Sequence, residues 1–282
     1  MPVSMSGGAG RTPEQLREQY EVEKRLATKL KNASREERKT LYGSVYDELF
    51  KSVPHHPQLT RKENAERELR QGLVHGLAQL LARFVGKETR FLEVGAGDCA
   101  LTLHVASLAK HVYALDVSAQ ISHNESVPAN FELILSDGCS VPVAAGSLDV
   151  AFSHQLLEHV HPEDALEQLR NIHAALAPGG CYICITPSSF SGPHDISKYF
   201  EDVPGGFHLK EYSTAELVRV FKEAGFRRFR AFFWSKGILL RMPAGLIVAV
   251  EALMGALPRS WNRKLASAYP WNRILGNFIA YK

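Results

Sequence analysis

Phe91-Leu92-Glu93-Val94-Gly95-Ala96-Gly97-Asp98 runs from an apolar strand directly into two closely spaced glycines. Glycine has no Cβ atom, so the backbone at Gly95 and Gly97 can turn sharply and a flat ligand can lie against it. The acid Glu93 stands two residues before the first glycine. The stretch therefore predicts a loop that binds a nucleotide-type cofactor.

A second predicted strand, His111-Val112-Tyr113-Ala114-Leu115-Asp116, ends in a carboxylate. Asp116 follows Gly97 by about 20 residues, the spacing at which an acid holds the hydroxyls of a ribose. The glycine loop and this acid together indicate a nucleoside site more strongly than either feature alone.

The composition of the 282-residue chain is that of a folded α/β protein, with 45% hydrophobic residues and a formal net charge of +3. Such a chain can form one large domain with additions or two small domains. Because the charge is small for this length, no nucleic-acid partner is expected. The segment Met1–Gly10 lacks the apolar stretch of a signal peptide, so a cytoplasmic location is expected.

The four cysteines do not resemble a secreted disulfide framework. Cys181 and Cys184 have CxxC spacing, but they lie in a predicted strand, where residues three apart point to opposite faces. One metal ion could not easily bind both sulfurs. All four cysteines, which are Cys99, Cys139, Cys181 and Cys184, are therefore expected to be structural thiols.

Residues 1–88 are predicted to form an N-terminal helical cover. Two sequences, Ser34-Arg35-Glu36-Glu37 and Thr60-Arg61-Lys62-Glu63, have the capping-box pattern of helix starts. The last helix of this region carries a stripe of apolar residues at helical spacing, which should pack on the following sheet. The stripe consists of Leu69, Leu73, Leu77, Leu80, Leu81 and Phe84.

Residues 89–282 are predicted to form the core domain, because strands alternate with helices from Thr89 onward. This order predicts a parallel sheet with helices on both sides. Helices are expected near 100–109, over 162–176 and from Ser213 to Gly225. The expected strands are 89–94, 111–115, 131–135, 148–153, 181–186, 226–235 and 277–282.

An apolar segment, 237–275, separates the last two predicted strands and is expected to be a helical insertion. Arg241, Pro243 and Glu251 interrupt its apolar part, 237–257, which therefore falls short of a membrane span. A buried or lid-forming helical hairpin is the first interpretation. Peripheral contact of 237–257 with a lipid surface or a lipid-like acceptor is the alternative.

The order of these motifs resembles that of the class I S-adenosylmethionine-dependent methyltransferases, particularly the type 11 small-molecule group. It comprises the Glu-x-Gly-x-Gly loop, the acid after the second strand, Ser136-Asp137-Gly138 after the third, and Leu176-Ala177-Pro178-Gly179-Gly180 before the fifth. The resemblance covers about 89–229. It implies a Rossmann-like sheet with S-adenosyl-L-methionine as cofactor.

The resemblance also implies roles for residues at the strand ends. Gly95, Ala96 and Gly97 would lie against the methionine and ribose parts of the cofactor, with Glu93 near the amino group. Asp116 would accept hydrogen bonds from both ribose hydroxyls. Val117, the next residue, is also expected to bind the cofactor.

Further along the chain, Asp137 would accept from the adenine amino group and the Gly138 amide would contact the ring. Ser153, His154 and Gln155 end the fourth strand, where ligands of open α/β sheets bind, and one or more of them should border the sulfonium. The cofactor-binding candidates among these three are Ser153 and Gln155.

Histidine is the natural acid–base residue near neutral pH, and the chain has twelve. His208 precedes the helix that begins near Ser213, where similar methyltransferases have a histidine that faces the acceptor, so it is the leading candidate base. His154 is the second. Glu158-His159 matches a common family pattern and is expected to order its loop. A metal site built from these histidines would need a convergence that spacing cannot show, so no metal site is predicted.

The predicted reaction is O-methylation of a small molecule with a histidine base. A bulky, partly apolar acceptor is expected from the helical cover and the insertion: a secondary metabolite, a glycosylated compound or a lipid-linked precursor. N- or C-methylation remains open. So do an NAD(P)-dependent oxidoreductase, since 95–100 also satisfies GxGxxA, and a non-catalytic cofactor-binding protein.

Overall fold

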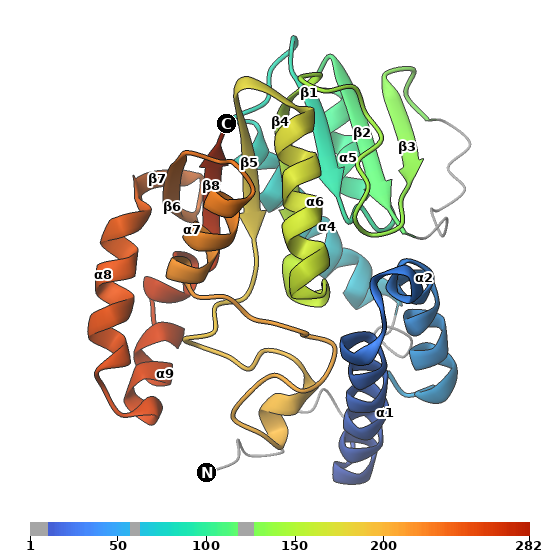
Figure 1. Ribbon diagram of the computed structural model, residues 1–282, viewed down its shortest axis with the longest axis vertical. Coiled ribbons are helices and arrows are strands. Elements are labelled where there is room, and N and C mark those ends of the chain that lie inside the picture. The colour runs from blue at the N-terminus through green and yellow to red at the C-terminus, as the bar shows by residue number, and fades with distance from the viewer. Residues whose placement is uncertain (1–10, 57–62, 118–126) are drawn as a thin grey trace.

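The computed structural model describes residues 11–56, 63–117 and 127–282 (Figure 1). In this part of the chain eight strands form a single sheet in the order β3-β2-β1-β4-β5-β8-β6-β7. The strands are β1 (Arg90–Val94), β2 (His111–Asp116), β3 (Phe131–Leu135), β4 (Leu148–His154), β5 (Leu176–Ile185), β6 (Arg228–Ser235), β7 (Ile238–Pro243) and β8 (Asn277–Tyr281). The predicted α/β fold class is thus confirmed.

Strands β1 to β5 pair in parallel, whereas β8 is antiparallel to both β5 and β6. Helices α5 (Ala100–Ala106) and α6 (Pro162–Ala175) provide crossovers within the parallel part, and α7 (Thr214–Glu223) lies between β5 and β6 in the chain. Parallel strands require such crossovers, which place all their carboxyl ends at the same edge of the sheet. Asp116 and His154 end β2 and β4 at that edge.

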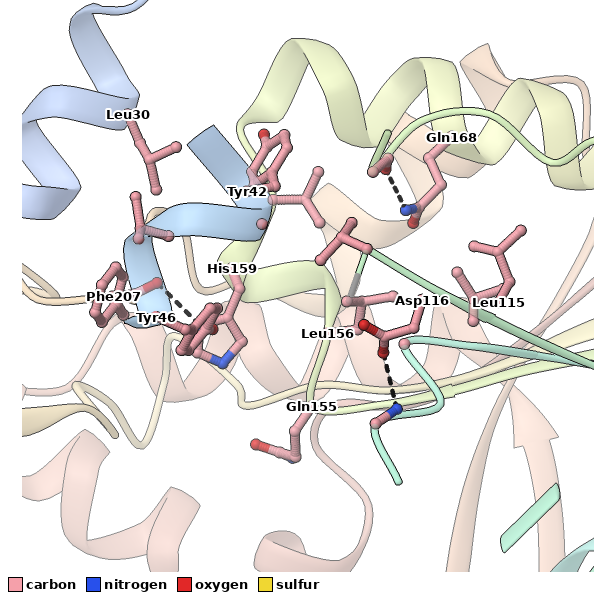
Figure 2. Close-up of a pocket in the computed structure, with 18 of the residues that line it drawn as sticks. Leu30, Tyr42, Tyr46, Leu115, Asp116, Gln155, Leu156, His159, Gln168 and Phe207 are labelled. Atoms are coloured by element: carbon pink, nitrogen blue, oxygen red, sulfur yellow. Dashed lines mark hydrogen bonds between the residues drawn. The ribbon is translucent and has the colours of Figure 1, made fainter. Parts of the chain in front are cut away.

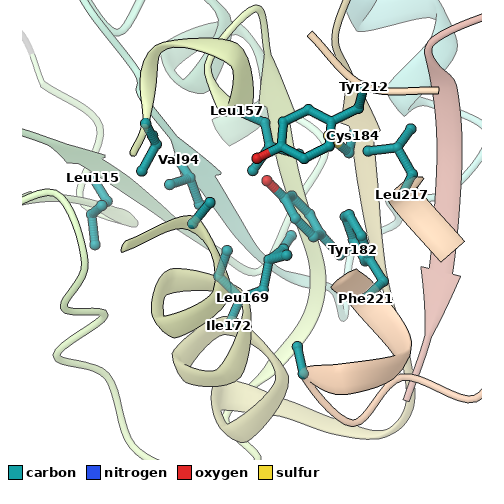
Figure 3. Packing of buried hydrophobic residues seen from close by; sticks show 14 of the residues in the cluster. Val94, Leu115, Leu157, Leu169, Ile172, Tyr182, Cys184, Tyr212, Leu217 and Phe221 are labelled. Atoms are coloured by element: carbon teal, nitrogen blue, oxygen red, sulfur yellow. The ribbon is translucent and has the colours of Figure 1, made fainter. Parts of the chain in front are cut away.

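Both faces of the sheet are buried in apolar clusters. On one face Phe221 of α7 packs against the ring of Tyr182, in a cluster that also contains Leu169 of α6, Val94 and Leu115 (Figure 3). The other face packs against α4 (Glu63–Leu81) and α5. Cys181 belongs to the second cluster and Cys184 to the first, so they do point to opposite faces. All four cysteines are buried and free.

The N-terminal cover consists of α1 (Pro13–Asn32), α2 (Arg35–Ser52) and α4. Ser34 forms the predicted capping box with Glu37, and Thr12 forms another with Gln15. The capping box predicted at 60–63 lies outside the described residues. Helices α1 and α2 lie beyond the carboxyl ends of the parallel strands (Figure 1).

The apolar stripe of α4 is only partly buried. Leu77, Leu80 and Leu81 pack against the sheet and α5, as predicted. Leu69 and Leu73 are 65% and 47% exposed, so their predicted burial is wrong. Their exposure follows from the short span of α5, Ala100–Ala106, because the apolar cluster forms around only the C-terminal half of α4.

The insertion before the last strand is not helical throughout. Lys236 and Gly237 both have positive φ, 48° and 78°, and form a two-residue turn that pairs Ser235 with Ile238. Such turns match the twist of a hairpin, so 238–243 becomes the edge strand β7 instead of a helix. The helices α8 (Ala244–Gly255) and α9 (Arg259–Ser267) follow.

The charged residue in the middle of α8 has a structural role. Glu251 is buried and accepts hydrogen bonds from the backbone N–H and hydroxyl of Thr214, at the first turn of α7. A carboxylate in this position satisfies an unpaired amide at a helix N-terminus. Glu251 thereby joins α8 to the core.

No helix in the described ranges is long and apolar enough to cross a bilayer. Leu246 and Leu253 on α8 and Trp261 on α9 are exposed. Peripheral contact of this region with lipid stays a prediction, as does the cytoplasmic location.

Candidate active site

A cavity of about 620 Å³ lies between α2 and the carboxyl ends of β1 and β2 (Figure 2). We call it the first cavity. Its volume is within the range of sites for small molecules and cofactors. Its walls come from the strand ends, the loop after β4, and the cover. They include Val94, Gly95, Gly97, Asp98, Leu115, Asp116, Val117, Gly138, Gln155, Leu156, His159, Tyr42, Gly43, Tyr46 and Phe207.

The glycine loop forms one wall of the first cavity. Gly95 and Gly97 have positive φ, 74° and 55°, which only glycine adopts without strain. A Cβ atom on Gly95 would meet Leu156 at 2.9 Å, whereas no atom lies within 4 Å of a Cβ on Gly97. The Gly97 N–H donates a 2.8 Å hydrogen bond to Asp116 Oδ2, which joins the loop to the end of β2. The bare backbone of Gly97 and the carboxylate of Asp116 thus line the cavity together.

The loop after β3 contributes Gly138 rather than Asp137. Asp137 Oδ1 accepts hydrogen bonds from the backbone N–H groups of Cys139 and Ser140, and its Oδ2 accepts from the Ser140 hydroxyl. These bonds lower the pKa of Asp137 in spite of its partial burial. Asp137 is not among the residues that line the first cavity, so its structural role here is to shape the turn.

Helix α2 is fixed above the first cavity by a buried ionic network. Both oxygens of Asp164, in the first turn of α6, accept hydrogen bonds from Arg38, at 2.6 and 2.8 Å. The Tyr42 hydroxyl donates to Asp164 at 2.7 Å and accepts from the His161 N–H. The Tyr42 ring then lies against Gly138, where a Cβ would meet it at 2.8 Å. The network therefore positions a wall of the cavity.

A second cavity of about 220 Å³ adjoins the first, and we call it the second cavity. Tyr46, His159 and Phe207 line both cavities. The rings of Tyr46 and Phe207 stack with centroids 5.2 Å apart, and His159 lies edge-on to Tyr46. The other walls of the second cavity are mostly polar and include Arg11, Gln19, Glu23, His56, His194, Asp195, Lys198 and His208.

His208 is held by a carboxylate at the wall of the second cavity. Its Nδ1 donates a 2.7 Å hydrogen bond to Glu211, which also accepts from the backbone N–H of His194. Burial opposes the protonation of His208, but the bond to Glu211 and the nearby carboxylates of Glu158 and Asp195 together outweigh it, so the pKa of His208 is raised. Burial alone would raise the pKa of the Glu211 carboxyl, but the hydrogen bonds from His194 and His208 outweigh it and lower this pKa to about 2.

The other sequence candidates at the end of β4 lie outside both cavities, with one exception. Gln155, at a positive φ of 53°, lines the first cavity. Ser153 is fully buried and bonds to the Tyr182 hydroxyl at 2.7 Å. His154 lines neither cavity, and burial lowers its pKa to about 4. The expected contacts of Ser153 and His154 with the reacting groups are therefore not supported.

Glu158 and His159, which are adjacent in the loop after β4, converge with His208 from the loop before α7. One ring nitrogen of each histidine and a carboxylate oxygen of Glu158 all lie within 4.8 Å of one another. Burial raises the pKa of Glu158 to about 7 and lowers that of His159 to about 3. Spacing in the sequence could not show this convergence, which arises because the chain folds 207–208 back onto the loop after β4.

Residues 92–184, which carry the glycine loop and Asp116, match the family model described as "Methyltransferase domain". Over these residues the chain carries a methyltransferase domain, and its sheet has the Rossmann-like order of the class I S-adenosylmethionine-dependent enzymes. The match decides against the alternative of a dinucleotide-dependent oxidoreductase, which rested on the GxGxxA spacing.

A curated methyltransferase is similar to part of this chain. Phosphoethanolamine N-methyltransferase 1 of Triticum aestivum is 30% identical over 151 residues, which cover 51% of this chain and 28% of that enzyme. The chain therefore spans less than a third of the curated relative it matches.

Two solved structures have the same fold. A SAM-dependent methyltransferase from Archaeoglobus fulgidus matches with a TM-score of 0.50 and 16% identity, over 76% of this chain and 94% of that one. A chain from the complex that contains the Haloferax volcanii Trm112 methyltransferase activator matches with a TM-score of 0.54 and 16% identity, over 78% and 94%.

The first cavity fits S-adenosylmethionine, the cofactor of this class of domain. Asp116 offers a carboxylate where the ribose is expected, and the open Cβ position of Gly97 leaves room against the backbone. Gly95, Val117, Gly138 and Gln155 line the same space. Ala96 is buried behind the loop and contributes packing instead.

Glu93, on β1 just before the glycine loop, does not line the first cavity. It is buried, and the Thr102 hydroxyl of α5 donates a hydrogen bond to it. Burial raises the pKa of Glu93 to about 8. The observed partner of Glu93 is thus Thr102 of the core helix α5.

Replacing Glu93 by glutamine is expected to stabilise the cofactor-free protein at pH 8 but not near pH 4.5. The raised pKa means that the folded state holds a proton that the unfolded state loses, so the stability falls as the pH rises from about 4.5 to about 8. Glutamine mimics the neutral form and should recover on the order of 3 kcal/mol at pH 8. Urea unfolding at several pH values measures the effect, and a difference that does not change with pH would contradict this explanation.

Several site residues had no signal in the sequence. Phe207 and Glu211 come from the loop before α7, and Arg38 and Asp164 are brought together across 126 positions. Such pairs depend on how the cover packs on the core, which local patterns do not encode. Tyr46, by contrast, stands in the predicted cover and lines both cavities.

Proposed function

We propose that this protein methylates an oxygen of a small polar molecule, with the cofactor in the first cavity and the acceptor in the second. The observation that carries the proposal is the shared boundary of Tyr46, His159 and Phe207. Two adjoining cavities allow a donor and an acceptor to be held in contact while the aromatic rings exclude water. Such positioning is the main contribution of a protein to a transfer of this kind.

The residues of the first cavity hold and orient the cofactor. S-adenosylmethionine, when bound, supplies the methyl group as an electrophilic carbon on a sulfonium. Asp116 is proposed to accept the ribose hydroxyls, and the Gly95–Gly97 backbone to lie against the adjacent part of the molecule. Helix α2, anchored through Arg38 and Asp164, keeps Tyr42 and Tyr46 over the site.

His208 is proposed to accept the proton of the acceptor. Its Nδ1–H is engaged with Glu211, so in the neutral ring Nε2 carries the lone pair. An oxygen nucleophile gains from losing its proton, which favours O-methylation in a cavity with such a base. Because the pKa of His208 is raised, the rate is expected to increase with pH above the usual imidazole range.

The acceptor is proposed to be smaller and more polar than the sequence led us to expect. The bulky apolar acceptor was inferred from the insertion, but no residue of 237–275 lines either cavity. The lid interpretation of the insertion has no support for the same reason. The second cavity is small, and histidines and carboxylates line it.

N-methylation is the second candidate, for a specific reason. Glu23 and Asp195 line the second cavity, and carboxylates there would attract an ammonium group. The wheat relative is named as an N-methyltransferase acting on phosphoethanolamine. An amine needs less help from a base, so the effect of removing His208 separates the two candidates.

Replacing His208 by alanine is expected to lower kcat by about 10²- to 10⁴-fold, the usual contribution of a general base. Binding of S-adenosylhomocysteine should change less than threefold. An acceptor is first found by incubating cell extracts with a deuterated methyl donor and detecting the labelled product by mass spectrometry. His104 is an exposed histidine on α5, and His104→Ala is the matched control. An unchanged kcat in His208→Ala would remove His208 as base and favour an amine acceptor.

A further inference from the structure

The cluster of Glu158, His159 and His208 has the composition of a metal-binding site. Its three ligand atoms lie within 4.8 Å of one another. His159 lines both cavities and His208 lines the second, whereas Glu158 lies behind them and lines neither. Glu158 is fully buried, and its Oε1 accepts no hydrogen bond from any described residue, although His159 Nε2 is 3.9 Å away. A buried carboxylate oxygen without a partner is costly, and a cation beside it would remove that cost.

The three side chains are also held in the way that metal ligands are held. His159 Nδ1 donates to the Phe207 carbonyl at 3.0 Å, and His208 Nδ1 donates to Glu211 at 2.7 Å. Both bonds leave Nε2 as the nitrogen that can bind a cation. The second oxygen of Glu158 accepts from the Thr186 hydroxyl at 2.9 Å. Ligating histidines nearly always donate their other N–H to a carbonyl or carboxylate in this manner.

We propose that Glu158, His159 and His208 bind one divalent transition-metal ion at the boundary of the two cavities. Two imidazoles and one carboxylate suit Zn²⁺, Fe²⁺ or Co²⁺ better than Mg²⁺ or Ca²⁺, which prefer oxygen ligands. At metal–ligand distances of about 2.0–2.2 Å, the ligand atoms would be about 3–4 Å apart. Small side-chain rotations would bring the present cluster to that separation.

The surrounding charges favour a cation. Glu23, Asp195 and Glu211 are near the histidines, and Arg11 and Lys198 are the basic residues among the described residues that line the second cavity. A three-ligand set leaves coordination positions for a substrate oxygen. A role for the ion in holding the acceptor oxygen rests on the proposed function. With the ion bound, His208 would be a metal ligand rather than a free base. The binding of the ion itself does not depend on that function.

The test is metal binding by the full-length protein after treatment with a chelator and desalting. Co²⁺ is titrated with visible absorption as readout and Zn²⁺ by calorimetry. We expect one equivalent to bind, with at least about a 100-fold loss of affinity in Glu158→Gln and in His208→Gln. Glu211→Gln, which weakens the support of His208 but leaves the three ligands in place, should lose about 10- to 100-fold. His104→Ala is the matched control and should bind as the wild type does.

The inference is overturned if the wild type binds no stoichiometric ion, or if Glu158→Gln and His208→Gln bind it as tightly as the wild type. It is also overturned if ethylammonium binds in a Glu158-dependent manner while Co²⁺ does not, because the cluster would then recognise an amine. Circular dichroism shows whether each variant is folded. If Glu158→Gln does not fold, the affinity of His208→Gln serves as the evidence instead. Titration of the same samples with S-adenosylhomocysteine separates failure of the metal site from failure of the proposed function.

Discussion

Replacing Asp116 by alanine is expected to weaken binding of S-adenosylhomocysteine by at least about 100-fold. A carboxylate that accepts two ribose hydroxyls makes two charge-assisted hydrogen bonds, each contributing about 1.5–3 kcal/mol. Every 1.4 kcal/mol corresponds to about a tenfold change in affinity. The variant also loses the acceptor of the Gly97 N–H, which orders the loop. Isothermal titration calorimetry with S-adenosylhomocysteine measures the loss.

Two further variants make the Asp116 prediction specific. Asp116→Asn keeps the shape and part of the hydrogen bonding, so its affinity should lie between those of the wild type and Asp116→Ala. Asp149→Ala removes a carboxylate that pairs with Arg90 at the other end of the parallel strands and should leave the affinity unchanged. If Asp116→Ala melts normally and binds within threefold of the wild type, the ribose assignment is wrong.

Replacing Arg38 by alanine is expected to lower the free energy of unfolding by about 3–5 kcal/mol, the usual cost of leaving a buried charge without its partner. Arg38 is 2% exposed and Asp164 is 1% exposed, so water cannot easily replace the lost contacts. The same change should weaken binding of S-adenosylhomocysteine, because the network also fixes Tyr42 over the first cavity. Urea unfolding gives the stability, and calorimetry gives the affinity.

Arg35 offers a matched control on the same helix. It pairs with Glu167 of α6, but its side chain is half exposed. Exposed ion pairs contribute about 0–1 kcal/mol, so Arg35→Ala should have little effect. Equal losses in Arg35→Ala and Arg38→Ala would show that burial of the network is not what anchors α2.

Local patterns in the sequence were sufficient for most of the fold. The glycine loop, the acid at Asp116 and the strands on either side were predictable because each depends on neighbouring residues or on a short spacing. The Lys236-Gly237 turn was missed because the apolar residues after it are compatible with either a helix or a strand. The burial of Leu69 and Leu73 was wrong because periodicity does not show how far the neighbouring helix extends.

The candidate site could be predicted only in part. Gly97, Asp116 and Gly138 line the first cavity, as expected from strand ends that meet at one edge of a sheet. The second cavity could not be foreseen, since it depends on contacts such as that between His159 and Phe207, 48 positions apart. Asp137 and Ser153 were plausible from their positions, but each is engaged in hydrogen bonds within the core or its turn.

The central claim is that the first cavity binds the methyl donor with its reactive end toward the second cavity. A crystal structure of the protein with S-adenosylhomocysteine tests it most directly. The account predicts ribose hydroxyls bonded to Asp116, and the sulfur at the boundary formed by Tyr46, His159 and Phe207. A nucleoside bound away from Asp116, or a sulfur that faces away from those three rings, would contradict it.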